Sequence, residues 1–213
     1  MEIEFYGGNC FKLKTKDTTI VIDDNLNKIG KKSITTDKVV AFYTSKSLED
    51  EQAVKSARLV IDAAGEFEVG DLTVRGIQVR AHIDTEDQKT ATVFQFMYNN
   101  QTATIIGHIH PDISDEALEV ISGTDVLILP IGGNGFTLDI TGAASIIKKV
   151  EPDIVIPSQY AIKGINYEVP AIELEEFGKV APLASAEKMD SFKLSKSIED
   201  TGSQTKVVVL NTK

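Results

Sequence analysis

Short blocks of alternating or continuous hydrophobic residues fill the first half of the chain, a pattern typical of β-strands. Glycine, asparagine and aspartate pairs separate several blocks, as they do in turns. The pattern predicts strands at residues 3–6, 10–14, 18–23, 39–43, 59–61, 67–69, 72–80, 90–98 and 102–106. One helix is expected among them, at residues 48–57, because Glu49, Asp50 and Glu51 place negative charge in its first turn.

The second half of the chain alternates strands with helices. A helix is expected after Asp112 or Ser114, either of which could cap it. Further helices are predicted at residues 141–150 and 170–178, and strands at 126–129, 154–156 and 206–210. We find no repeat or linker and therefore expect one domain over residues 1–213. A strand-rich half followed by βαβα units favours two packed sheets with helices outside, an αββα sandwich.

Composition and charge narrow the range of partners. The 213 residues carry 22 basic and 32 acidic side chains, a formal net charge of −10. Such a chain repels phosphate backbones and anionic membrane surfaces, so we expect neither nucleic acid nor membrane as a partner. The single cysteine, Cys10, excludes a disulfide framework and fits a small buried hydrophobe. No apolar run is long enough to span a membrane, and residues 1–4 lack the features of a secretion signal, which predicts a cytoplasmic protein.

The three histidines are the candidates for chemistry. His108 and His110 lie two residues apart, so an extended backbone would point both rings to one side, and His82 ends another predicted strand. With Asp84 or Asp112 they could hold one zinc-like ion if the two loops converge.

Other strand ends carry weaker signals. The polar residues of segment 43–50 fit helix capping, and Gly132 and Gly133 allow either a tight turn or the close approach of a ligand. Glu66 and Glu68 could form a carboxylate pair, although a solvated hairpin face explains them equally well. No nucleotide-binding fingerprint or nucleophile elbow is present.

Several motifs, in order, resemble the metallo-β-lactamase superfamily, in particular small bacterial zinc-dependent hydrolases related to ascorbate-6-phosphate lactonase. The residues that carry the resemblance are 6–11 (Tyr-Gly-Gly-Asn-Cys-Phe), 19–23, 65–69 (Gly-Glu-Phe-Glu-Val), 129–133 with Thr137 and Asp139, 151–157 (Glu-Pro-Asp-Ile-Val-Ile-Pro) and 205–210. They span nearly the whole chain. The resemblance implies an α+β fold, the four-layer αββα sandwich of metallo-β-lactamase type.

The family's metal-ligand loop, Thr-His-x-His-x-Asp-His, falls on residues 43–50, which contain no histidine. By the same resemblance His82 keeps a family histidine, and His108 stands where the family has a bridging aspartate. The vestigial ligand positions are Ser45, Ser47, Glu49, Asp50 and Gln159, with the first four shifting by one or two residues if the loop holds an insertion.

This loss predicts a degenerate, non-hydrolytic protein, a pseudoenzyme with a binding or assembly role and no cofactor. In that case His82 and His108 are remnants, hydrogen-bonded in a cleft now filled by Tyr43 or Lys46. The alternative is a hydrolase of phosphoesters, lactones or similar compounds that binds one Zn or Mn ion at His82, His108 and His110. The sequence is therefore compatible with both an enzyme and a non-catalytic protein.

Two further expectations concern the cleft and assembly. The cleft is expected to hold Asp23, Glu66, Gly132, Gly133 and Lys46. Lys46 could replace the lost cation with a fixed positive charge, provided that an acid such as Asp23 or Glu66 lies nearby. By analogy with relatives, the chain could also form a homo-oligomer. The sequence does not identify its small-molecule ligand.

Overall fold

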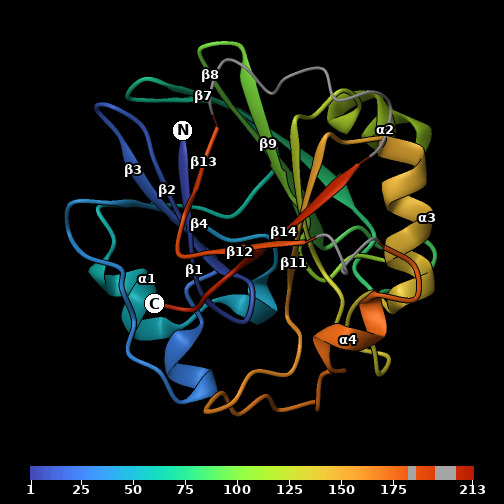
Figure 1. Ribbon diagram of the computed structural model, residues 1–213. Coiled ribbons are helices and arrows are strands. Elements are labelled where there is room, and N and C mark those ends of the chain that lie inside the picture. The colour runs from blue at the N-terminus through green and yellow to red at the C-terminus, as the bar shows by residue number, and fades with distance from the viewer. Residues whose placement is uncertain (182–185, 195–204) are drawn as a thin grey trace.

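The fold is built from two β-sheets that pack face to face, with helices on their outer sides (Figure 1). The computed structural model describes residues 1–181, 186–194 and 205–213. In Figure 1 the helices α2 (Asp115–Ile121) and α3 (Ile140–Val150) lie along one side of the molecule, whereas α1 (Glu51–Ser56) lies on the opposite side. The predicted α+β sandwich is therefore confirmed.

The sheet from the N-terminal half is antiparallel at one end and parallel at the other. In the described residues its spatial order is β13 (Phe192–Lys193), β1 (Glu2–Gly7), β2 (Cys10–Lys14), β3 (Thr19–Ile22), β4 (Val40–Phe42) and β5 (Leu59–Ile61). The pairs from β13 to β3 are antiparallel, and the pairs from β3 to β5 are parallel.

The second sheet follows the same arrangement along the chain, with antiparallel hairpins first and parallel strands later. Its order in the described residues is β12 (Glu187–Met189), β14 (Lys206–Leu210), β11 (Ile154–Ser158), β10 (Val126–Pro130), β9 (Gln101–Ile105), β8 (Ala91–Tyr98), β7 (Leu72–Val79) and β6 (Gly65–Val69). Strands β12 to β9 pair in parallel, and β9 to β6 pair antiparallel.

Short helical segments complete the described structure: the 3-10 helices η1 (Leu26–Ile29) and η2 (Lys46–Leu48), and α4 (Leu174–Phe177). Within the described ranges, no helix combines the length and apolar character that crossing a bilayer requires.

Aromatic residues join the two sheets in the core. The ring of Phe42 on β4 meets Phe94 and Phe96 on β8 edge-on, at centroid distances of 5.2 and 5.1 Å. All three side chains are fully buried. Cys10 is also buried, among apolar residues that include Val21 and Leu26, as its small hydrophobic character predicted.

The helix predicted at residues 48–57 is shorter and is preceded by a separate turn, η2. Asp50 has an extended backbone, and its carboxylate accepts hydrogen bonds from the amides of Gln52 and Ala53. Asp50 therefore caps α1, which begins at Glu51. Glu49 therefore lies outside the helix. Similarly, Ser114 rather than Asp112 caps α2.

The prediction of a helix at 170–178 was correct only for its second half. Ile172 donates its amide to the carbonyl of Gly132 and accepts from the amide of Ala161, so the preceding residues are held in a non-helical connection. Local patterning also missed η1, β12 and β13, whose few residues lack a period of their own.

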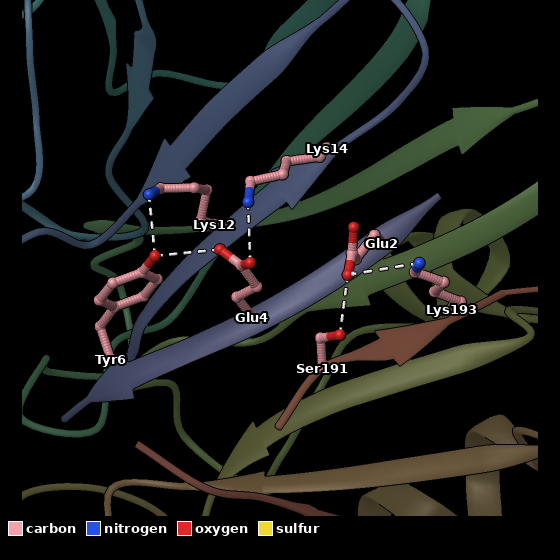
Figure 2. Close-up of polar contacts among 7 residues, drawn as sticks. All are labelled: Glu2, Glu4, Tyr6, Lys12, Lys14, Ser191 and Lys193. Carbon is pink, nitrogen blue, oxygen red and sulfur yellow. Dashed lines mark hydrogen bonds and ion pairs between the residues drawn. The ribbon is translucent and has the colours of Figure 1, made fainter. Parts of the chain in front are cut away.

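A network of charged and hydroxyl groups covers the outer face of β1 and β2 (Figure 2). Glu4 accepts hydrogen bonds from Lys14 at 2.8 Å and from the hydroxyl of Tyr6 at 3.0 Å. Lys12 donates to that hydroxyl and lies over the Tyr6 ring. Burial raises the pKa of Glu4, but the bonds from Lys14 and Tyr6 outweigh it and lower the pKa overall.

We expect Glu4→Gln to lower the free energy of unfolding at pH 7 by about 1–2 kcal/mol, because it replaces charge-assisted hydrogen bonds. The folded-state pKa lies below the unfolded value, so the stabilisation is present above that value and is lost as pH falls through the folded pKa. Urea unfolding at pH 7 and at about pH 3.5 would measure this difference. The exposed Glu66→Gln is the control and should cost less than about 0.5 kcal/mol.

Candidate functional site

The ends of strands from both sheets meet on one side of the sandwich. The loop after β4 is tied to the second sheet, because Thr92 donates its amide to the carbonyl of Thr44 at 2.7 Å and Ser45 forms a bridge with Ala91. The candidate loop therefore lies against the start of β8.

A buried chain of polar side chains fixes this meeting point. The carboxylate of Asp23, after β3, accepts from the amide and the hydroxyl of Thr44 and from the Asn9 side chain, each at 2.7 Å. The hydroxyl of Ser158, at the end of β11, donates to Asn9 at 2.6 Å and extends the chain to the second sheet. Burial raises the pKa of Asp23 to about 6, against the opposing effect of its hydrogen bonds.

Gly107 lets the histidine segment approach this chain closely. A Cβ atom at Gly107 would lie 2.0 Å from the hydroxyl oxygen of Thr44, a distance that no side chain tolerates. The position directly before His108 therefore requires glycine for steric reasons, even though its φ lies outside the left-handed region.

The two histidine-bearing loops converge, as the zinc hypothesis required. Ala81 and Ile109 form a β-bridge, His82 donates its amide to the carbonyl of His108 at 2.8 Å, and His110 donates to that of Arg80. The rings of His82 and His110 lie 6.2 Å apart, centroid to centroid.

His108 is almost wholly buried and lacks a hydrogen bond at either ring nitrogen within the described part of the chain. Its ring packs edge-on against Phe136, with centroids 4.6 Å apart. Burial lowers the pKa of His108 to about 4, opposed by the nearby side chain of Gln159. The hydrogen bonds expected for these histidines are not found at His108, and Nδ1 of His82 also lacks a partner in the described residues.

The two candidate carboxylates do not join the histidines. Asp84 accepts from the amides of Ala81 and Thr90 and from the Thr90 hydroxyl, so its carboxylate closes the loop between β7 and β8. Those bonds outweigh the effect of burial and lower the pKa of Asp84. The Asp112 side chain is exposed, and its backbone amide donates to Nδ1 of His110 at 3.1 Å.

The residues present do not fit a bound metal ion. Across residues 1–181, 186–194 and 205–213, no group of three or more histidine, cysteine, aspartate or glutamate side chains could hold one. A zinc ion needs at least three protein ligands, so the loops converge without assembling a ligand set.

Charged side chains of the loop after β4 form ion pairs within the loop and with the residue that follows β5. Lys46 is exposed and pairs with Asp62 and, at 2.9 Å, with Glu49. These hydrogen bonds, first of all that with Asp62, raise the pKa of Lys46. The acids beside Lys46 are therefore not Asp23 or Glu66, as the sequence suggested, because Asp62 and Glu49 are closer in space.

The other residues expected in the cleft do not gather at one site. The hydroxyls of Ser45 and Ser47 lie 3.0 Å apart. Tyr43 is buried beneath α1 with Ala41 and Leu48 rather than filling the space beside His108. Glu66 is exposed on the edge strand β6 and pairs with Arg75, as in a solvated hairpin, and does not join the expected cleft.

The glycines after β10 are required by close packing. A Cβ at Gly132 would lie 2.4 Å from the backbone oxygen of Gln159, and Gly133 has a φ of +67°. Gln159 itself has a φ of +54°, and its buried side-chain oxygen has no hydrogen bond in the described structure. Gln159 directly follows β11 and packs against Gly132 after β10, so it lies where these two strands end.

Sequence reasoning missed several residues that shape the site, above all Phe136, Thr44 and Asn9. Phe136 follows a glycine-rich turn and shows no periodicity. Asn9 and Thr44 lie in quoted motifs, but nothing local indicates that both contact Asp23.

Comparison with known proteins now identifies the family. A family model described as the beta-lactamase superfamily domain matches residues 2–159. This chain belongs to the metallo-β-lactamase superfamily.

Several solved structures share this fold along most of their length. A proposed Zn-dependent hydrolase from Thermotoga maritima aligns with a TM-score of 0.74 and 21% identity over 100% of this chain and 99% of its own. Igni18, a metallo hydrolase from Ignicoccus hospitalis, aligns with a TM-score of 0.61 and 18% identity, over 91% of this chain and 99% of its own. An isothiocyanate hydrolase from Delia radicum gut bacteria aligns with a TM-score of 0.66 and 11% identity, over 92% and 100%. At these identities the likeness establishes the fold alone.

We expect the Asp23 carboxylate to make this superfamily member more stable as pH falls from about 7.5 to 5. Its folded pKa, about 6, lies above the ordinary aspartate value of 3.8, so the folded state binds the proton more tightly, and stability is lost as pH rises through the folded pKa. Between these two pH values the free energy of unfolding of the wild type should rise by about 1 kcal/mol more than that of Asp23→Asn. Urea unfolding of both proteins at both pH values would measure this difference.

The exposed Asp37→Asn is the matched control and should follow the wild type. An equal pH response in wild type and Asp23→Asn would show that Asp23 does not titrate as described.

Proposed function

We propose that this superfamily member does not hydrolyse substrates and that its former metal pocket has a binding role. The observation that supports the proposal is that the charged side chains of the loop at residues 43–50 already have partners within the protein. Lys46 pairs with Asp62 and Glu49, and Asp50 caps α1 and accepts from the Asn27 side chain. Since these acids already have partners, the loop offers no set of free carboxylates to a metal.

The chemistry of hydrolysis in this superfamily supports the same proposal. A bound cation makes water nucleophilic near neutral pH by lowering its pKa, and the cation needs three or more good ligands to remain bound. Serine hydroxyls and a lysine ammonium are poor zinc ligands. The resemblance to small bacterial zinc-dependent hydrolases, a cytoplasmic location and homo-oligomer formation remain predictions from the sequence.

The second candidate is a hydrolase with a relocated mononuclear site at His82, His108 and His110. The bridge between Ala81 and Ile109 favours it, because it brings both histidine loops together. Against it stands the lack of a three-ligand group among the described residues.

Calorimetric titration with Zn²⁺ and Mn²⁺ would separate the two candidates, using protein purified without affinity-resin metal and treated with chelator. We expect no stoichiometric binding and no hydrolysis of phosphodiesters, lactones or thioesters with either ion added.

About one equivalent of bound metal, lost in both His82→Ala and His108→Ala, would contradict this and establish the relocated site. Metal-dependent turnover of any substrate class in the panel would overturn the proposal directly.

A further inference from the structure

A small cavity of about 130 Å³ opens beside His108. Its wall is formed by Ser45, Lys46 and Ser47 of the loop after β4, by Thr90 before β8, and by Phe136 after β10. Three loops that follow different strands therefore enclose one space.

His108 is the polar group that lines this cavity without a partner. Its side chain is 4% exposed, and neither Nδ1 nor Nε2 makes a hydrogen bond within the described residues. Buried polar atoms in folded proteins nearly always have a partner, because an unmade hydrogen bond costs about 1–3 kcal/mol. The imidazole thus indicates a ligand that completes its hydrogen bonds.

The charged groups around the cavity are already balanced. The ammonium of Lys46 faces Asp62 and Glu49, and the carboxylate of Asp84 is held by Thr90 and a backbone amide. An anion or a cation would enter without a counter-charge and would lose its hydration, which is costly in a confined space. An uncharged occupant avoids that cost.

The size and the apolar walls further restrict the occupant. A cavity of about 150 Å³ lined by apolar side chains can hold benzene, so this one suits roughly six to eight non-hydrogen atoms. Phe136 offers an aromatic surface next to His108. Ile83, which is 70% exposed, also lines the cavity and would lose apolar exposure to a bound ring.

We propose that this cavity binds a small uncharged ligand of about the size of phenol, whose single hydroxyl or amide group hydrogen-bonds to His108 while its apolar part lies on Phe136. The inference rests on the proposed function, since it assigns the ligand class to the same metal-free pocket. The Ser45 and Ser47 hydroxyls share one hydrogen bond and leave a donor for the same polar group.

Phenol, benzene and benzoate are the probes, since they differ only in the group that would face His108. The chain has three histidines, so their ring NMR signals can be assigned and followed in the wild-type protein with EDTA present. We expect phenol to shift the His108 ring signals with at least tenfold higher affinity than benzene or benzoate. His110, which does not line the cavity, serves as the internal control.

In His108→Phe, phenol affinity should fall to that of benzene, and the wild-type titration keeps the test valid if this variant does not fold. Unchanged His108 signals, equal affinity for the three probes, or tighter binding of benzoate would overturn the inference and leave the metal-free proposal standing. Phenol binding that appears only after zinc is added would overturn both.

Discussion

The carboxylate of Asp23 is the contact on which the arrangement of the site loops depends. It is fully buried and receives three hydrogen bonds, two from Thr44 and one from Asn9, and Ser158 joins the chain through Asn9. Removing any donor would leave a buried acceptor short of a partner, which costs more than the bond itself contributes. The ends of β3, β4 and β11 are therefore held together by buried polar groups.

This constraint explains why the pocket keeps its shape without a ligand set. Thr44 is fixed by Asp23, and Gly107 packs directly against it, which positions the buried imidazole of His108. The loop beyond Thr44 then balances its own charges through Lys46 and Asp62. A scaffold that positions loops for hydrolysis in the superfamily is thus preserved here, while the polar groups facing the cavity suit hydrogen bonding.

Much of the fold could be predicted from the sequence, because strand periodicity and turn residues act locally. Segments 10–14, 59–61 and 206–210 have the predicted bounds, whereas β12 and β13 are too short to show a period. The site was less predictable, because its contacts join residues far apart in the sequence. The sequence names the three histidines as one group only on the condition that their loops converge. The pairing of Lys46 with Asp62 could not be predicted, because it depends on β4 and β5 lying side by side.

The most direct test of the central claim, that the histidine loops converge without forming a metal site, is anomalous diffraction from crystals soaked in Zn²⁺. We expect no anomalous peak within bonding distance, about 2.0–2.1 Å, of the ring nitrogens of His108. A peak shared by His108 and a second histidine, with the loop after β4 unchanged, would contradict it and identify a metal centre.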